Sequence, residues 1–288
     1  MNPITFPALG ISVQIDRVAF SLFGKDIYWY GIILALGFLL GSWVASRQYV
    51  RLGGQEDDAL DMLLYAAPTA ILCARIYYVV FYLDLYRNTD GSFNWREAIA
   101  IWDGGIAVYG SIIGAVLASY IYCRVRKLDF LTMADAYAFG LLVGQIIGRW
   151  GNFVNQEAYG GACTLPWRMG LTLGNGVAVE VHPTFLYESL WNLLGLGLLF
   201  WVVRPRRCFN GMLFCYYLFW YGLGRFWIEG MRTDSLYLFH TGIRVSQMVA
   251  LICVAAAGGV LVWKLCLHRK QEPSEAVEEA ESGGSERK

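Results

Sequence analysis

Apolar stretches of membrane-spanning length recur along most of the chain. A transmembrane helix needs roughly 20 mostly apolar residues to cross a hydrocarbon core about 30 Å thick. Stretches of about this length lie at residues 30–46, 60–82, 104–122, 131–148, 183–203, 211–228 and 245–265. The pattern predicts an all-α integral membrane protein with seven transmembrane helices.

The chain ends differ from these stretches. Within an N-terminal segment at 1–29, residues 11–23 alternate partly between apolar and polar positions, which favours an interfacial strand or a short amphipathic piece. The segment lacks the basic region, apolar stretch and cleavage site of a signal peptide. Residues 266–288 form an acidic segment rich in Glu and Ser, which predicts a disordered cytoplasmic tail. The seven-helix membrane domain, with any catalytic site, is therefore expected at 30–265.

Composition supports a membrane protein. Hydrophobic residues make up 57% of the 288-residue chain, and charged residues make up 16%, against roughly 25% in typical soluble domains. The mean hydropathy is +0.43. These values exclude a disordered chain and a nucleic-acid binder, and they argue against an ordinary soluble domain. The 23 basic and 23 acidic residues cancel, so the net charge indicates no partner.

The distribution of basic residues predicts the orientation. They follow the first, third, fifth and seventh spans, as Arg47, Arg51, Arg124, Arg126, Lys127, Arg204, Arg206, Arg207, Lys264, Arg269 and Lys270. Basic residues in short loops mark the cytoplasmic side of a membrane. The N-terminus is therefore expected outside and the C-terminus in the cytoplasm. The long outer loop at 149–182 holds most of the unusual polar residues, so the active face is expected at the outer leaflet.

Cysteine and histidine spacing indicates no metal or redox site. The seven cysteines are scattered without a CxxC pair, and the three histidines lie far apart. HExxH and GxSxG patterns are absent from the sequence. We therefore expect neither a metal nor an organic cofactor.

Several charged residues fall within the predicted spans, where an ionisable group needs a partner or a water-filled cavity. Arg75 can be interpreted as half of an internal ion pair, with Glu188 or Asp103 as its partner. Arg149 and Arg225, by contrast, have few acidic neighbours in the sequence near their expected membrane face. Two such arginines predict an anion site, because a guanidinium group binds phosphate through two hydrogen bonds.

The densest polar stretch is residues 148–160, with the sequence GRWGNFVNQEAYG. Its glycines, Gly160 among them, allow tight turns and close approach of a ligand. Asn152 and Asn155 supply amide groups, and Glu157 can fix an arginine or accept a proton. We expect an irregular segment that lines a cavity, because irregular backbone at membrane depth is otherwise costly.

This stretch resembles the signature of bacterial prolipoprotein diacylglyceryl transferases, of the form G-R-x-G-N-F-x-N-x-E-x-x-G. Further matches follow in order along the chain. They are Trp29-Tyr30-Gly31, Arg75 with Tyr78, Trp102-Asp103-Gly104-Gly105, His182-Pro183 with Tyr187-Glu188, and Tyr221-Gly222 with Arg225, Glu229 and Arg232. The resemblance covers residues 28–264 and implies a seven-span protein of the bacterial inner membrane.

The resemblance implies transfer of a diacylglyceryl group from phosphatidylglycerol to the lipobox cysteine of a preprolipoprotein signal peptide. A thioether forms and glycerol phosphate leaves. The catalytic residues would be Arg149, Arg225, Tyr109 and Glu229, where Glu229 either positions Arg225 one turn away or acts as a base. Substrate would be bound by Arg149, Asn152, Asn155, Glu157, Gly160, Tyr30 and Arg232.

One position departs from the family pattern. Tyr109 stands where many members carry His, and a phenol with an ordinary pKa near ~10 is a poor base at neutral pH. Tyr109 would then donate a hydrogen bond to a phosphate or leaving oxygen, or another group would be the base.

Two other functions stay open. A lipid transporter or flippase would share the polar residues within the spans, and a head-group phosphatase would share the two arginines. The sequence shows neither an obvious inverted repeat nor the nucleophilic His or carboxylate cluster of a phosphatase.

Overall fold

A computed structural model describes residues 3–88, 91–173, 176–238 and 241–285, and it describes side-chain surroundings as far as His268, apart from Asp103. The chain divides into two compact units. The first contains Met1–Ala45 and Asp135–Lys288, and the second contains Ser46–Ala134.

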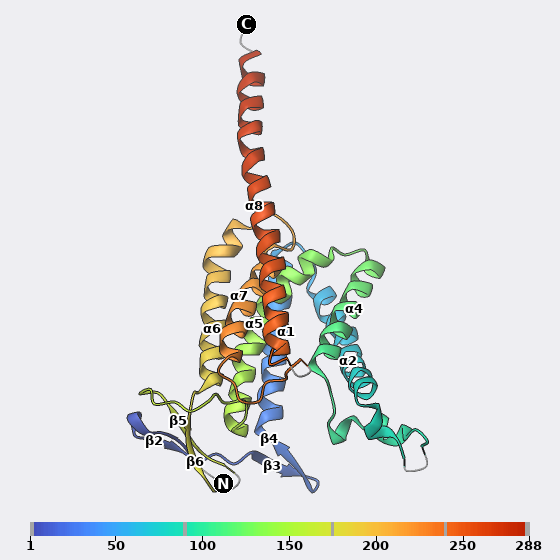
Figure 1. The fold of residues 1–288 in the computed structure, drawn as a ribbon. Helices are drawn as coiled ribbons and strands as arrows, with labels where there is room; N and C mark the ends of the chain where they lie inside the picture. Colours follow the sequence, from blue (N-terminus) through green and yellow to red (C-terminus); the bar gives the residue numbers. More distant parts are fainter. Residues whose placement is uncertain (1–2, 89–90, 174–175, 239–240, 286–288) are drawn as a thin grey trace. The chain divides into compact units, whose positions relative to one another are not determined.

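Long helices dominate both units (Figure 1). The helices that belong mainly to the first unit are α1 (Trp29–Arg51), α5 (Phe130–Asn155), α6 (Thr184–Leu198), α7 (Met212–Glu229) and α8 (Val245–Ser285). A π-helical turn at Leu199–Val203 and a 3-10 turn at Arg204–Arg206 continue α6. The second unit contains α2 (Glu56–Phe81), α4 (Val108–Arg126) and the short α3 (Trp95–Ile99).

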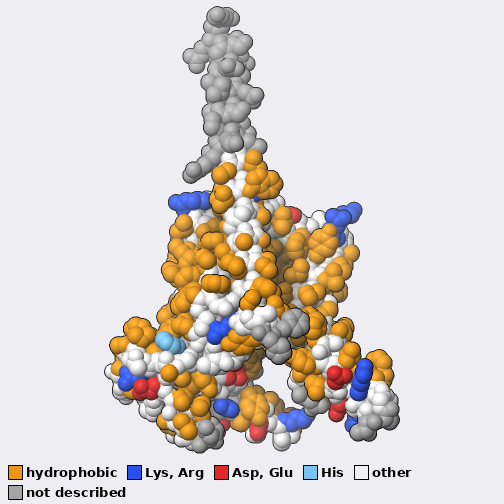
Figure 2. Space-filling model, in the orientation of Figure 1, with side chains coloured by type: hydrophobic (Ala, Val, Ile, Leu, Met, Phe, Trp, Pro, Cys, Tyr) orange, Lys and Arg blue, Asp and Glu red, His pale blue; other side chains and the backbone are white. Residues whose placement is uncertain are grey.

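Six of the helical segments in the described residues are long and apolar enough to cross a membrane. They are Trp29–Arg51, Glu56–Phe81, Val108–Arg126, Phe130–Asn155, Thr184–Arg206 and Val245–His268. Figure 2 shows mostly hydrophobic side chains along the visible helices, with charged side chains near helix ends and in loops. Six of the seven predicted spans therefore coincide with helices that have the length and hydropathy of a membrane span. The helix expected at 211–228 is present as α7, but its charged, Tyr and Trp residues lower its hydropathy, and it is not among the six.

Two small sheets accompany the helices, which the all-α prediction did not include. β1 (Ile4–Phe6), β2 (Ile11–Val13), β5 (Met169–Thr172) and β6 (Ala178–Val181) form an antiparallel sheet in the order β2-β1-β5-β6. β3 (Val18–Leu22) and β4 (Lys25–Tyr28) form a hairpin. Strands therefore occupy much of residues 11–23, where either a strand or a short amphipathic piece was expected. The larger sheet escaped prediction because its strands are short and β1 pairs with β5 from a distant part of the chain.

The signature segment differs from the irregular structure expected for it. Helix α5 continues to Asn155, so Arg149 lies inside the helix rather than at its end. The chain turns only afterwards, where Gln156 and Ala158 have φ values of 54° and 56°. Glycine in a helix costs about 1 kcal/mol relative to alanine. At Gly151 a larger residue would crowd the Tyr30 ring, because a Cβ there would lie 2.8 Å from it.

The C-terminal segment also differs from its prediction. The structure continues α8 to Ser285, through residues whose composition predicted a disordered tail. Several Glu and Ala residues lie in this segment, and both residue types favour helix.

Close helix packing and a buried carboxylate organise the first unit. A Cβ on Gly41 of α1 would lie 2.6 Å from the carbonyl oxygen of Gly140 on α5, so the backbones of these helices nearly touch. At the beginning of α5, the fully buried Asp135 accepts hydrogen bonds from Arg207 Nε and from the backbone N–H groups of Gly211 and Phe214, each at 2.9 Å. These bonds attach the N-terminus of α7 to α5.

The Gly41–Gly140 contact predicts a stability difference between two glycine substitutions. Gly140→Ala should lower the melting temperature in detergent by several degrees, because overpacking costs about 1–3 kcal/mol. Gly259→Ala is the matched control, since a Cβ at this position of α8 meets no atom within 4 Å. Equal melting temperatures for the two variants would contradict the close contact.

Candidate functional site

The first unit contains a cluster of three arginines around one buried carboxylate. Glu188, in the second turn of α6, is only 4% exposed. Its Oε2 lies 2.5 Å from Arg149 Nη2 of α5, and its Oε1 lies 3.2 Å from Arg225 Nη1 of α7. Arg232 Nη1, just after α7, lies 3.6 Å from the same Oε1. Three helices thus bring their charged groups to one point.

Two further acids complete this group. Arg225 Nη2 lies 2.6 Å from Glu229 Oε2, so the predicted i,i+4 contact is present. Arg232 donates from Nε and Nη2 to the two carboxylate oxygens of Asp234, at 3.0 and 2.8 Å. These hydrogen bonds hold the pKa of Asp234 below its usual value. The pair should therefore persist at neutral pH and weaken only as acid protonates Asp234. We call Arg149, Arg225, Arg232, Glu188, Glu229 and Asp234 the arginine cluster.

The cluster corrects two expectations. Arg149 and Arg225 do converge, but they meet at Glu188 instead of lying among few acids.

Glu188 was considered only as a partner for Arg75. In the structure, Arg75 donates instead to backbone carbonyls of its own unit, with donor–acceptor distances of 2.5–2.9 Å. These carbonyls belong to Glu97, Ala98, Gly104 and Gly105. Sequence spacing could not distinguish these partners, because they lie on separate helices or loops. The side chain of Asp103, the other expected partner, lies outside the described residues.

The amide residues of the signature connect the cluster to a cavity. Arg149 Nη1 donates to Asn152 Oδ1 at 3.4 Å, and Asn152 Nδ2 donates to Glu157 Oε1 at 2.9 Å. Glu157 lines a cavity of about 740 Å³. The signature residues therefore form a polar connection from Glu188 to the cavity wall.

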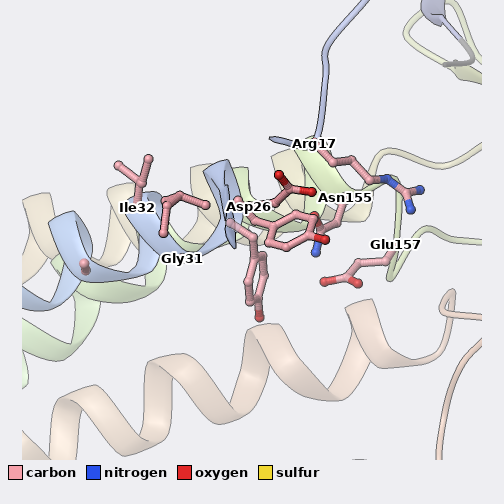
Figure 3. A pocket seen from close by; sticks show the side chains of 10 residues that line it. Arg17, Asp26, Gly31, Ile32, Asn155 and Glu157 are labelled. Atoms are coloured by element: carbon pink, nitrogen blue, oxygen red, sulfur yellow. The ribbon is translucent and has the colours of Figure 1, made fainter. Parts of the chain in front are cut away.

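The cavity lies between the N-terminal hairpin, α1 and the end of α5 (Figure 3). Arg17, Asn155 and Glu157 lie near one another at one end, and Ile32 lies toward the other. The lining residues are Arg17, Asp26, Ile27, Tyr28, Tyr30, Gly31, Ile32, Ala35, Asn155 and Glu157. Three predicted site residues are thus brought together: Tyr30, Asn155 and Glu157. Arg17 and Asp26 were not among the predicted site residues, although two charged residues in a partly alternating apolar segment were a usable signal.

Gly160 has a structural role that its sequence context did not reveal. It forms an antiparallel bridge with Arg232, and its N–H donates to the carbonyl of His182 at 3.0 Å. A Cβ at this position would lie 2.7 Å from His182 Cβ. The close approach expected for a ligand is made by the protein itself, and the bridge helps to hold Arg232 within the cluster.

Tyr109 lies in the first turn of α4, within the second unit, so its part in any chemistry stays a prediction.

Among the described residues, no group of three or more His, Cys, Asp or Glu side chains could hold a metal ion. The cavity and the cluster offer hydrogen-bond donors, acceptors and guanidinium groups, which suit an oxyanion with a polar head group.

Comparison with known proteins agrees with this chemistry. The family model described as prolipoprotein diacylglyceryl transferase matches residues 17–263. Three curated relatives carry the name phosphatidylglycerol–prolipoprotein diacylglyceryl transferase. The Clostridioides difficile protein is 45% identical over 85% of this chain and 93% of its own length. The Lysinibacillus sphaericus protein is 44% identical over 88% of this chain and 93% of its own length. The Finegoldia magna protein is 47% identical over 85% of this chain and 94% of its own length. The chain belongs to the prolipoprotein diacylglyceryl transferase family.

Proposed function

We propose that this chain transfers the diacylglyceryl group of phosphatidylglycerol to the lipobox cysteine thiol of a preprolipoprotein. The convergence of Arg149 and Arg225 at one point is the observation that carries the proposal. The names of the relatives, which match over most of this chain, support the same substrates. The cysteine thiol loses its proton, a carbon–sulfur bond forms at the glyceryl carbon, and the bond from that carbon to the phosphate oxygen breaks. Glycerol phosphate leaves with the bonding electron pair, and the net reaction releases one proton to the leaving phosphate or to water.

The arginines would stabilise the charge that moves to the departing phosphate oxygen. A cation aimed at that oxygen favours the transition state over the ground state. Each guanidinium carries five N–H donors, so Arg149 and Arg225 can contact Glu188 and still offer donors to phosphate. Their positive charge would also favour the thiolate form of the incoming cysteine.

The cavity would hold the glycerol head group. Asn155, Glu157 and Tyr30 line it, and Asn152 links it to Arg149. Gly160 and Arg232 would complete the site through the bridge between them. Glu229 would position Arg225, because its carboxylate contacts that guanidinium directly. The phosphate would then bind at the arginines, with the head group in the neighbouring cavity.

We further propose a seven-span topology in the bacterial inner membrane, with α7 as the remaining span. Its 18 residues extend about 27 Å at 1.5 Å per residue. Arg207 contacts α5 near its beginning, at Asp135, whereas the arginine cluster lies near the other end of α5. If Arg204, Arg206 and Arg207 lie in the cytoplasm, as the positive-inside rule favours, the cluster would lie at the outer leaflet, with the N-terminus outside and the C-terminus inside.

Transfer to a peptide tests the activity. The full-length protein in vesicles that contain phosphatidylglycerol should add the mass of a diacylglyceryl group to a lipobox peptide. Arg149→Ala should reduce the rate at least about 100-fold, by loss of charge stabilisation, and Arg149→Lys should recover only part of it. Arg168→Ala is the matched control, because it removes an arginine from a more exposed ion pair of 2.7 Å with Glu180. Lipid movement or head-group release without peptide modification would instead favour a transporter or a phosphatase.

Substitution of Tyr109 tests the departure from the family pattern. Tyr109→Phe should lower kcat about 10- to 100-fold if the hydroxyl donates to a phosphate or leaving oxygen. Tyr109→His should retain activity, because imidazole also donates and accepts hydrogen bonds. A Phe variant with the wild-type rate would remove this side chain from the chemistry.

Cysteine labelling tests the orientation. In a variant whose seven native cysteines are replaced, Lys25→Cys in the hairpin should react with an impermeant thiol reagent added outside the cell. Arg206→Cys, after α6, should react only once the membrane is permeabilised. Both positions are exposed, so reversed labelling would contradict the proposed topology.

A further inference from the structure

One carboxylate occupies the position where the three arginines converge. The two oxygens of Glu188 contact Arg149, Arg225 and Arg232 at 2.5, 3.2 and 3.6 Å. Paired oxygens that accept from guanidinium groups are also what a phosphate presents. Glu188 therefore engages some of the N–H donors that a phosphate at this site would use.

The charges of the cluster balance without a ligand. Arg149, Arg225 and Arg232 carry three positive charges, and Glu188, Glu229 and Asp234 carry three negative charges when ionised. A phosphodiester substrate carries one negative charge, whereas a phosphomonoester carries about −1.5 to −2 at neutral pH. Without the Glu188 charge the cluster would keep Glu229 and Asp234 and carry one net positive charge, and it would therefore hold glycerol phosphate more strongly than phosphatidylglycerol. A fixed carboxylate repels the more highly charged product more.

Burial indicates how Glu188 and a ligand would share the arginines. The side chains of Arg149 and Arg225 are each 19% exposed, whereas that of Glu188 is 5% exposed. An anion from solvent would therefore reach the side chains of the two arginines more readily than the Glu188 carboxylate. Glu229 differs from Glu188, because it lies on the same helix as Arg225 and contacts no arginine of α5 in the described structure.

We infer that Glu188 is a positioning residue that holds the three arginines together and competes with phosphate for them, thereby speeding release of glycerol phosphate. The inference rests on the proposed function for the identity of the product. It assigns to Glu188 no proton transfer and no contact with the reacting carbon. Bound glycerol phosphate should therefore slow turnover less than it would if Glu188 carried no charge.

Glu188→Gln tests this role, because glutamine keeps the size and an acceptor oxygen while it removes the charge. In the full-length protein in phosphatidylglycerol vesicles, the inhibition constant of glycerol 1-phosphate should fall about tenfold or more. The KM for phosphatidylglycerol should fall less, and kcat should decrease because product leaves more slowly. Isothermal titration of glycerol 1-phosphate into the detergent-solubilised protein measures the same affinity without turnover. Glu180→Gln, at the more exposed pair with Arg168, should change none of these values.

The outcomes separate this inference from the proposed function. Absence of peptide modification by the wild-type protein would overturn the proposed function, while the titration still measures the effect of Glu188. Normal transfer with unchanged product affinity in Glu188→Gln would overturn the inference alone. If Glu188→Gln does not fold, Glu188→Asp provides the second test. Its shorter carboxylate should hold the arginines less well and raise product affinity by a smaller factor, and unchanged affinity would again overturn the inference.

Discussion

The contact of Glu188 with three guanidinium groups is the interaction on which the site depends. It joins α5, α6 and α7 at one level, and it gives each arginine a partner where an unpaired charge would be costly. Removal of one member of a buried charged group leaves the others uncompensated. The geometry of the site and the stability of its helices are therefore coupled through the same carboxylate.

The surrounding packing explains how this contact is held in place. At one end of α5, Asp135 bonds to Arg207 and to the beginning of α7. Along α5, Gly140 allows α1 to approach closely. Beyond the end of α5, Gly160 pairs with Arg232 and brings the chain after α7 beside the cluster. These contacts limit the freedom of the helices that carry Arg149 and Arg225, which favours a preorganised anion site.

The second unit shows a different use of a buried arginine. Arg75 donates to four backbone carbonyls, two in the short helix α3 and two in the glycine-containing loop before α4. Glycine is favoured at position 105, because its φ is 72° and a Cβ there would lie 2.5 Å from Arg75 Nη1. Arg75 thus orders a glycine-containing loop instead of forming one of the ion pairs suggested by its sequence. A charge within a span indicates a buried interaction, but it does not identify the partner.

The sequence by itself determined the features that depend on local spacing and composition. These are the positions of six candidate membrane spans, the helical contact of Arg225 with Glu229, and the polar signature at 148–160. Tertiary structure decided that Glu188 pairs with Arg149 and Arg225, that Gly160 supports Arg232, and that Arg17 and Asp26 share a cavity with Glu157. The physical reason is distance along the chain. Helical periodicity fixes which residues share a face within a few turns, whereas contacts between helices depend on packing that no local pattern encodes.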